Sequence, residues 1–365
     1  MNNPMNTFPQ RILIIRLSAI GDVVRTLPAL RALRSTFPSA YIAWVVEENA
    51  YNLLEEHPDL DRVFLFKRKQ WTEEIVSAHN FLKPLKEVRA FFKAIREDHF
   101  DRVLDFHGIL KSGVISILSG TPERVGFSRN YCKEGNYLFN NRHIDVGTAS
   151  LNRIERNLRF IRFLGIDAGN HDPIVPVTDE DRSLIDTFLR EKGLVQHTPL
   201  IAIHPGTSSK TLYKRWDPLS YARVADTLIE RYNANIIWTW GPDELEAVTA
   251  AVAHMKRDST VACRVSLRQL AELFRRCDLF LGSDSGPMHI ASFVKTPVVV
   301  IYGPTDHRIN APYENNPHRV LRKDVSCNPC RKRDCSSVAC MSAISPEEVI
   351  EAVTQLLTSP RTGVF

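Results

Sequence analysis

Apolar positions near the start of the chain alternate between short unbroken runs and longer, helically spaced segments. Residues 11–16 (RILIIR) and 41–46 (YIAWVV) are compact apolar runs, of the kind that forms parallel strands buried on both faces. Between them, apolar residues of segment 23–37 fall on one side of a helix. We place Pro28 in the first turns of that helix, since proline breaks a helix interior. Strand, helix and strand in this order predict a βαβ unit.

The same alternation continues along the chain with one interruption. Further strands are predicted at 63–66, 102–106, 201–204, 236–240, 279–281 and 298–302, and helices at 80–98, 217–232, 243–255, 267–276 and 345–357. Ser345, Pro346 and Glu348 predict the start of the last helix as cap, first helical residue and capping box. The pattern fades between about 170 and 200, and we place a linker at 181–199.

These elements predict an α/β fold class with two facing Rossmann-like domains, parallel sheets and a deep inter-domain cleft. At 365 residues the chain is long enough for two domains. We expect a disordered lead at 1–10 without the pattern of a signal peptide, a first domain at 11–180, a second at 200–344 and a final helical segment at 345–365.

Composition limits the classes of partner. Hydrophobic residues make up 44% and charged residues 24% of the chain, which is ordinary for a soluble protein, and no apolar run is long enough to predict a membrane span. The net charge of +5 is too small to argue for nucleic acid, but it suits an acidic substrate or an anionic membrane surface. Seven cysteines without an export signal indicate a reducing compartment.

The segment 278–291 (DLFLGSDSGPMHIA) combines a buried strand, a glycine-bounded turn and a helix start. Free amides and a partial positive charge at a helix start favour phosphate groups, and we expect Gly282 and Gly286 to let a ligand approach the backbone. Because a carboxylate repels a diphosphate, Asp284 is expected to orient the loop or accept hydrogen bonds from sugar hydroxyls. His289 could face the same cleft. The alternative is an ordinary turn capped by Asp284.

The loop after the first strand offers a different kind of group. It has one glycine and an acid instead of G-x-G-x-x-G, which argues against a dinucleotide site there. Ligands of open α/β sheets bind outside the carboxyl ends of the strands, so Asp22 is our candidate catalytic base. The alternative is that Asp22 caps the following helix.

Two loops of the second domain carry further candidates. The small hydroxyls of Ser208 and Ser209 suit phosphate oxygens, and Lys214 could neutralise charge on a departing diphosphate. The alternative is a solvated basic loop. Glu244 and Glu246 follow the next strand, where an acid is well placed to hold ribose hydroxyls, although at least one of them is expected on a solvated helix face.

Five segments in this order are more specific than any one of them: IRLSAIGDVVRTLPAL, HPGTSSKTLYKRW, WGPDELEA, GSDSGPMHIA and YGPTD. Together they resemble the ADP-heptose:lipopolysaccharide heptosyltransferases of glycosyltransferase family 9, over residues 11–357. DFHGILKS at 105–112 and RVGF at 124–127 resemble heptosyltransferase I, which adds the first heptose to the Kdo region of the core. The resemblance implies a GT-B architecture, with the acceptor on the first domain, the nucleotide sugar on the second and the last helix crossing back to the first domain.

The resemblance also implies an inverting, metal-independent transfer and a set of site residues. Asp22 matches the general base of the family, and ADP-heptose is the implied donor, with no cofactor required. The donor-binding positions are Ser208, Ser209, Lys214, Glu246, Asp284, Ser285, Gly286, Met288 and His289, and the loop spacing leaves Ser208 against Ser209 open. The acceptor candidates are Lys67, Arg68 and Lys69, with Lys111 and Arg142 as weaker ones, facing an anionic Kdo-lipid A acceptor. A run of three charges is otherwise typical of a solvated loop.

Four cysteines late in the chain have the spacing C-x2-C-x4-C-x4-C. Cys327, Cys330, Cys335 and Cys340 could hold a structural zinc ion, and free thiols or an occasional disulfide are the alternative. We expect no catalytic role for them.

The resulting hypothesis is a monomeric heptosyltransferase that acts on the cytoplasmic face of the bacterial inner membrane, in peripheral contact with anionic lipid and without a nucleic-acid partner. Three alternatives stay open. The first is transfer of a later heptose or another sugar on the same scaffold, and the second is a nucleotide-sugar epimerase of GT-B shape. The third is a nucleotide-sugar or lipid-binding protein without catalysis, against which the presence of both Asp22 and Lys214 counts.

Overall fold

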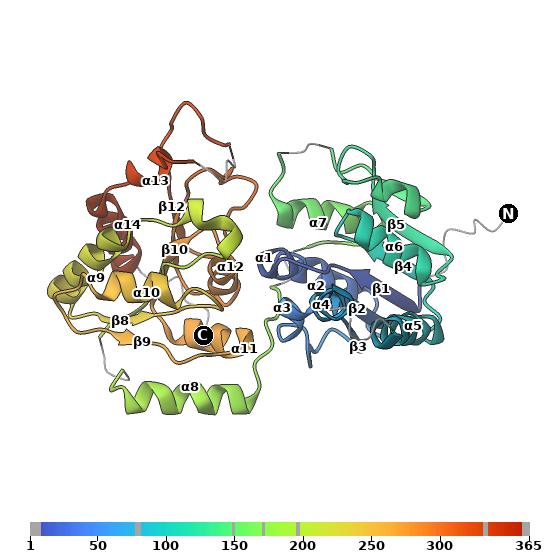
Figure 1. The fold of residues 1–365 in the computed structure, drawn as a ribbon, viewed down its shortest axis with the longest axis horizontal. Coiled ribbons are helices and arrows are strands. Elements are labelled where there is room, and N and C mark those ends of the chain that lie inside the picture. The colour runs from blue at the N-terminus through green and yellow to red at the C-terminus, as the bar shows by residue number, and fades with distance from the viewer. Residues whose placement is uncertain are drawn as a thin grey trace. The chain divides into compact units, whose positions relative to one another are not determined.

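The structure is a computed structural model that describes residues 9–76, 82–147, 150–169, 172–194, 198–330 and 335–359. The chain divides into two compact units, Met1–Pro176 and Val177–Phe365 (Figure 1). The division precedes the linker expected at 181–199, because α8 (Asp179–Glu191) packs on α11 (Leu267–Arg276) of the second unit. Positions 1–8 of the disordered lead expected at 1–10 lie outside the described residues.

The first unit is built on a six-stranded sheet with the order β3-β2-β1-β4-β5-β6. Every pairing between neighbouring strands of this sheet is parallel. The strands are β1 (Arg11–Ile15), β2 (Tyr41–Glu47), β3 (Arg62–Phe66), β4 (Arg102–Asp105), β5 (Glu123–Phe127) and β6 (Arg142–Ile144). The first four were predicted from their apolar runs, and their central residues are buried as such runs require.

Helices flank this sheet, and one of them departs from the prediction. The segment predicted as a helix at 23–37 is divided into α1 (Ile20–Val24) and α2 (Leu27–Thr36). Pro28 lies in the first turn of α2, because its ring would clash with the carbonyl of residue 24 in a continuous helix. The other helices are α3 (Glu48–Tyr51), α4 (Arg68–Val76), α5 (Leu82–Glu97), α6 (Leu110–Leu118), η1 (Asn136–Phe139) and α7 (Arg153–Arg162).

The second unit repeats the architecture. Its six-stranded sheet has the order β12-β11-β10-β7-β8-β9 with parallel pairings. The strands are β7 (Leu200–His204), β8 (Asn235–Trp238), β9 (Thr260–Val261), β10 (Leu279–Ser283), β11 (Val298–Ile301) and β12 (His318–Leu321). The remaining helices are η2 (Ser209–Lys214), α9 (Pro218–Tyr232), α10 (Leu245–Val252), α12 (Gly286–Phe293), α13 (Ala339–Ser342) and α14 (Pro346–Thr358).

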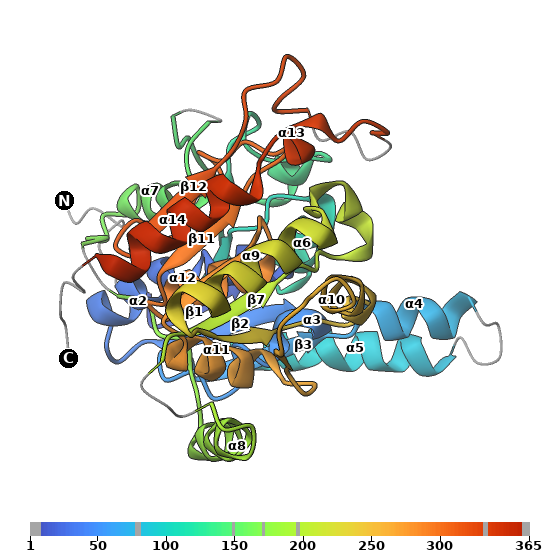
Figure 2. The same cartoon turned by 90° about the vertical axis from the view of Figure 1, so that its left-hand side faces the viewer.

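The last helix requires a correction. The start of α14 is as predicted, with the Ser345–Glu348 capping box and Pro346 in the first turn. The helix was expected to pack on the first domain. Its buried face instead lies beside α9 and over β10, β11 and β12 of its own unit (Figure 2). Val349 and Val353 are fully buried in the core of that unit, so the apolar stripe of α14 covers one face of the second sheet.

Each sheet has one point at which the strand order reverses. In the first sheet this switch point lies between β1 and β4, and in the second it lies between β7 and β10. Loops that leave neighbouring strands at a switch point diverge to opposite faces of the sheet and leave a crevice outside the carboxyl ends. The predicted fold class, α/β with two Rossmann-like units and parallel sheets, is confirmed, and each unit has one such position for a ligand.

Among the described residues, none of the helices combines the length and the apolar character needed to cross a membrane.

Candidate active site

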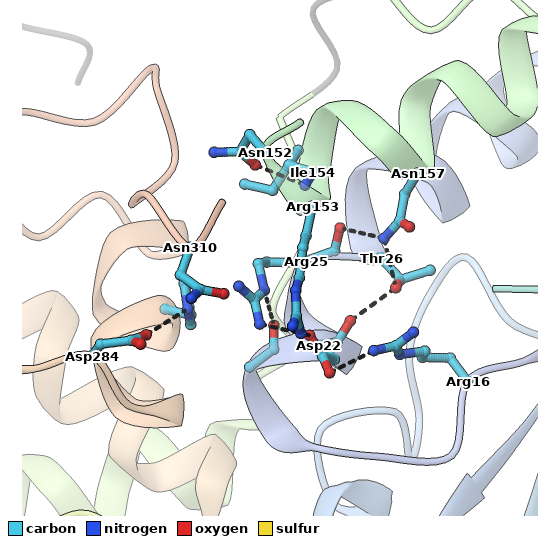
Figure 3. Close-up of polar contacts among 12 residues, drawn as sticks. Arg16, Asp22, Arg25, Thr26, Asn152, Arg153, Ile154, Asn157, Asp284 and Asn310 are labelled. Carbon is cyan, nitrogen blue, oxygen red and sulfur yellow. Dashed lines mark hydrogen bonds and ion pairs between the residues drawn. The ribbon is translucent and has the colours of Figure 1, made fainter. Parts of the chain in front are cut away.

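Asp22 lies in α1, directly after β1 at the switch point of the first sheet, and three guanidinium groups surround its carboxylate (Figure 3). Arg16 Nη2 is 2.5 Å from Oδ2. Arg25 Nη2 and Arg153 Nη1 are each 2.6 Å from Oδ1. The alternative of a helix cap is wrong, because α1 begins after Ala19 and Asp22 lies inside it.

The charges around Asp22 keep it ionised. Burial alone would raise the pKa of its carboxyl, but Arg16, Arg25 and Arg153 outweigh burial and hold the pKa well below its ordinary value. Asp22 is therefore a carboxylate at any physiological pH. A carboxylate so well paired is also a weak base in this arrangement, because each guanidinium stabilises the unprotonated form.

Main-chain carbonyl groups also accept hydrogen bonds from Arg16 and Arg25. Arg16 is 4% exposed, and its Nη1 donates to the carbonyl oxygen of Phe106 at 2.6 Å. Arg25 Nε donates to the carbonyl oxygen of Gly21 at 2.9 Å. Arg153 comes from the start of α7 and is the most exposed of the three, with 26% of its side chain accessible. Sequence reasoning missed all three, since no motif joins them to Asp22.

A buried polar network holds the loop on the other side of the switch point. Asp105 ends β4 and is fully buried. It accepts hydrogen bonds from the amides of His107 and Gly108 and from the side chains of Ser112 and Asn136. Burial nevertheless raises the pKa of Asp105. This network fixes the DFHGILKS segment beside Asp22.

His107 connects the two loops at the switch point. Its Nδ1 accepts the amide N–H of Leu17 at 3.1 Å, which requires the neutral ring. Burial and the neighbouring Arg16 lower the pKa of His107 to about 3, so the ring stays neutral and holds the loop that leads into α1.

The acceptor candidates divide into two groups. Arg68 and Lys111 meet at one carboxylate, that of Glu47 at the end of β2, which is 6% exposed. Arg68 Nε lies 3.0 Å from Glu47 Oε1, and Lys111 forms an ion pair with the same oxygen. Lys67 and Lys69 flank Arg68 at the carboxyl end of β3. All four lie on the edge of the sheet that also carries Asp22.

Arg142 does not belong to this group, and this prediction is wrong. It is the first residue of β6 and therefore lies at the amino end of a parallel strand. There its Nη1 is 2.8 Å from Glu123 Oε1, and Glu123 begins the neighbouring β5. The amino ends of all strands in a parallel sheet lie on the same side of the sheet. Arg142 therefore lies at the amino ends of the strands, whereas Asp22 lies at their carboxyl ends.

The second unit has an ion pair at the corresponding switch point. Lys214 ends η2 in the loop after β7, and Asp284 follows β10. Lys214 Nζ and Thr305 Oγ1 each lie 2.8 Å from Asp284 Oδ2. His289 Nε2 is 4.0 Å from Oδ1. Burial would raise the pKa of Asp284, but Lys214 and His289 outweigh it and the pKa is lowered, so Asp284 orients a charged Lys214.

The helix start expected after this strand is present. α12 begins at Gly286, and Ser285 precedes it as the flanking residue. The side-chain oxygen of Ser285 is buried and has no hydrogen-bond partner among the residues that the structure describes. The Met288 side chain is fully buried, so only its main-chain amide can meet a ligand. First-turn amides lack partners within a helix, which leaves this end of α12 suited to an anion.

Gly282 has a different role from the one expected. A Cβ atom at this position would lie 2.9 Å from the carbonyl oxygen of His204 and from the ring of Phe280. Glycine is therefore required here for packing of β10 against its surroundings, and the space is filled by the chain itself.

Ser208 and Ser209 are both exposed at the start of η2. The hydroxyl of Ser208 lies 3.2 Å from Thr211 Oγ1. The loop geometry leaves the choice between Ser208 and Ser209 open, because either hydroxyl can reach solvent at the carboxyl end of β7.

The structure separates the two glutamates considered for the ribose. Glu244 is buried, with Oε2 3.1 Å from His204 Nε2 and 2.8 Å from the amide of Gly241. Cβ atoms at Gly206 or Gly241 would each come within 2.8 Å of the Glu244 side chain, so both glycines make room for it. Burial would raise the pKa of Glu244, but His204 lowers it. Glu246 is exposed on α10, which makes Glu244 the better candidate.

The late cysteines give no support for zinc. Among the described residues, which include all four cysteines but not positions 331–334, no three His, Cys, Asp or Glu side chains are placed to hold a metal ion. Cys340 is buried, and burial with the neighbouring cysteines raises the pKa of its thiol.

Curated relatives match over most of the chain. The lipopolysaccharide core heptosyltransferase OpsX of Haemophilus influenzae is 27% identical over 84% of this chain and 83% of its own length. A lipopolysaccharide heptosyltransferase 3 of Escherichia coli is 24% identical over 94% of this chain and 98% of its own length. A lipopolysaccharide heptosyltransferase 1 of Campylobacter coli is 25% identical over 95% of this chain and 98% of its own length. Proteins named heptosyltransferase 1 and heptosyltransferase 3 are thus about equally similar to this chain.

Solved structures agree in fold. The glycosyl transferase family 9 protein from Veillonella parvula has a TM-score of 0.78 and 25% identity, covering 95% of this chain and 97% of its own. The E. coli heptosyltransferase WaaC with ADP has a TM-score of 0.74 and 21% identity, covering 95% and 99%. The two Rossmann-like units are therefore those of a GT-B glycosyltransferase.

The family model of glycosyltransferase family 9 (heptosyltransferase) matches residues 88–340. This range starts within α5 of the first unit and ends at Cys340, and it includes most of the motif positions described above. With charged sites at the switch points of both sheets and this match over more than half of its length, the chain belongs to glycosyltransferase family 9, the heptosyltransferases, and is a transferase.

Proposed function

We propose that this enzyme transfers heptose from ADP-heptose to the Kdo region of the lipopolysaccharide inner core, on a Kdo-lipid A acceptor, with inversion at the anomeric carbon. Family membership supports a heptosyl transfer. The relative named as a lipopolysaccharide core heptosyltransferase and the WaaC structure named with ADP support this acceptor class and this nucleotide.

One observation carries the proposal: the switch point of the first sheet has a negatively charged group, and the switch point of the second sheet has a positively charged group. The first has the carboxylate of Asp22, a group that accepts protons. The second has the ammonium of Lys214 beside the start of α12, groups that stabilise negative charge. A glycosyl transfer needs both, one for the acceptor and one for the leaving group.

The chemistry is a single displacement. The acceptor hydroxyl oxygen forms a bond to the anomeric carbon of heptose, while the bond from that carbon to the phosphate oxygen of ADP breaks. The hydroxyl proton passes to Asp22 as the new bond forms. The electron pair of the broken bond leaves with ADP, and Lys214 with the first amides of α12 stabilises that charge. Attack opposite the leaving group inverts the anomeric centre, and no second nucleophile is required.

Contact with the membrane is part of the proposal, because the acceptor is a lipid. α4 and α5 lie side by side (Figure 2) and expose aliphatic side chains near their joined ends: Ile75 is 55%, Val76 76%, Leu82 54% and Leu85 48% exposed. Lys86 and Arg89 are exposed on α5, and the exposed Lys69 and Lys83 form ion pairs with Glu73 and Glu74 of α4. Aliphatic side chains next to lysines suit the surface of an anionic bilayer.

The test is an assay of purified protein with ADP-heptose and Kdo2-lipid A, with mass spectrometry of the product. We expect one added heptose and release of ADP. A reaction without acceptor separates the epimerase alternative, which would yield an epimer or free sugar. An acceptor that already carries the first heptose separates transfer of a later heptose. Transfer only to that second acceptor would overturn the assignment to the first heptose.

A further inference from the structure

The positive charge around Asp22 exceeds what one carboxylate can balance. Arg16, Arg25 and Arg153 contact it directly, and Arg156 lies one helical turn from Arg153 on α7. The other buried carboxylate nearby, Asp105, is occupied by amide, hydroxyl and carboxamide donors. Buried like charges repel at low dielectric, so an additional anion would stabilise this cluster.

Donor groups in the cluster are still available. The Nε atoms of Arg16 and Arg156 are buried and have no hydrogen-bond partner among the described residues. The guanidinium of Arg156 lies over the ring of Phe127, 4.9 Å from its centroid. Burial, Arg16 and Arg153 lower the pKa of Arg156 to about 9, so the charged form of this side chain is disfavoured in its surroundings. A buried donor without a partner costs free energy that a bound oxyanion would recover.

The three partners of Asp22 differ in how accessible they are to a ligand. Arg16 and Arg25 are almost fully buried. Arg153 starts α7 and keeps 26% of its side chain accessible. A ligand that reaches Asp22 therefore meets Arg153 first.

We propose that Arg153 and Arg156 form a subsite for a carboxylate of the acceptor, and that this carboxylate draws Arg153 away from Asp22 when the acceptor binds. This inference rests on the proposed function, in which the accepting sugar is the sugar acid Kdo. The Kdo carboxylate belongs to the same sugar as the attacking hydroxyl, whereas the lipid A phosphates belong to other sugars. An oxyanion bound beside Asp22 is therefore the carboxylate. A planar carboxylate also suits the paired donors of a guanidinium.

The exchange has a consequence for the reaction. In the free enzyme Asp22 is held unprotonated by three guanidiniums. When the acceptor carboxylate takes Arg153, Asp22 loses one of them and becomes a better proton acceptor in the complex that needs it. Arg16, Arg25, Arg156 and the neutral His107 remain around Asp22. The acceptor thus activates its own base.

The test compares three variants of one helix, Arg153→Gln, Arg156→Gln and Arg162→Gln, by steady-state kinetics with Kdo2-lipid A. Arg162 pairs with Glu155 on the exposed side of α7 and serves as the control for lost charge. For Arg153→Gln and Arg156→Gln we expect the acceptor KM to rise at least about tenfold, as for a lost charge-assisted hydrogen bond. The ADP-heptose KM should stay unchanged, and kcat at saturating acceptor should stay within about threefold for Arg153→Gln. Arg153→Lys should restore part of the affinity.

Modified acceptors identify the anion. When the Kdo carboxyls are converted to methyl esters, the acceptor KM of the wild type should rise by about the same factor as in the two variants. The acceptor KM of the two variants should not rise further with the esterified acceptor. Removal of the lipid A phosphates should leave the difference between wild type and variants unchanged. Unchanged acceptor KM in both variants, or losses from ester and variant that simply add, would overturn the subsite. Failure of the wild type to use any Kdo acceptor would instead overturn the proposed function. Thermal melting identifies variants that fail to fold, and for these the Arg→Lys variants give the comparison.

Discussion

Lys214 Nζ lies 2.8 Å from Asp284 Oδ2, although the two residues follow different strands of the second sheet. The pair explains why an acid is found at a position suited to phosphates. Asp284 is buried and fixed by Lys214 and Thr305, so it positions the ammonium group and need not contact the diphosphate. Two donors on that ammonium contact Asp284, one its carboxylate at 2.8 Å and one its main-chain carbonyl oxygen at 3.4 Å. The group has three donors, which leaves one for a phosphate oxygen.

Replacing Lys214 by alanine should weaken the binding of ADP. The loss of a charged donor should raise the Kd at least about tenfold, measured by calorimetry. Lys210→Ala is the matched control, because Lys210 lies exposed on the same turn and should leave the Kd within about twofold. Equal affinity of Lys214→Ala and wild type would remove Lys214 from the donor site.

Glu244 and Glu246 provide an internal comparison for ribose recognition. Glu244→Gln should raise the Kd of ADP about tenfold, because the buried carboxylate held by His204 and Gly241 loses its charge. Glu246→Gln should have little effect, since this side chain is exposed on α10. A larger rise of the Kd in Glu246→Gln than in Glu244→Gln would instead support Glu246, which was assigned to the donor site from the sequence. Binding of inorganic pyrophosphate, which has no ribose, should be the same in both variants.

Asp22→Asn should lower turnover at least about a hundredfold, the range of a lost general base. The affinity for ADP should persist, because Asp22 belongs to the first unit and the nucleotide site is proposed in the second. The substitution also leaves three arginines without their carboxylate, so melting temperature is measured alongside activity. A folded Asp22→Asn protein with nearly wild-type turnover would exclude Asp22 as the base.

The fold was predictable because its signal is local. Buried parallel strands are continuous apolar runs, and the four central strands of the two sheets were found in this way. Asp22 and Lys214 were predicted for a related reason, since both follow such a strand directly or within one loop. The capping box at Ser345 is likewise a local pattern.

The errors come from relationships that span long stretches of chain. Arg153 contacts Asp22 from 131 residues away, and no spacing rule connects them. Arg142 was assigned to the acceptor by its charge, but a strand of three residues, β6, places it on the opposite edge of the sheet. The sheet on which α14 packs depends on which sheet face is not already covered by other helices. The apolar pattern of a single helix does not contain that information.

The exposed aliphatic side chains of α4 and α5 predict binding to anionic vesicles. The double variant Val76→Ser/Leu82→Ser should reduce the bound fraction on vesicles rich in phosphatidylglycerol at least about threefold, because buried apolar area is lost. Leu184→Ser on α8, which is 43% exposed, is the control. Binding should fall as salt is raised, since the lysines contribute through screened charge. Equal binding of the double variant and the control would exclude this surface.

The buried His107 predicts a dependence of stability on pH. Its pKa is about 3 in the folded protein and about 6.5 in an unfolded chain. Between these values the unfolded chain binds a proton that the folded chain does not, so the free energy of unfolding is full above about pH 6.5 and falls as the pH is lowered. His57 acts in the same direction, because burial lowers its pKa. The paired carboxylates have lowered pKa values and unfolded values near 4, so their effect on stability lies below this pH window.

The measurement is urea unfolding at several pH values between about 7.5 and 5. The slope of the free energy of unfolding against pH should be smaller in His107→Gln than in the wild type, and it should be unchanged in His143→Gln, which alters an exposed position. An unchanged slope in His107→Gln would show that His107 is not the buried neutral group that holds Leu17 and the loop before α1.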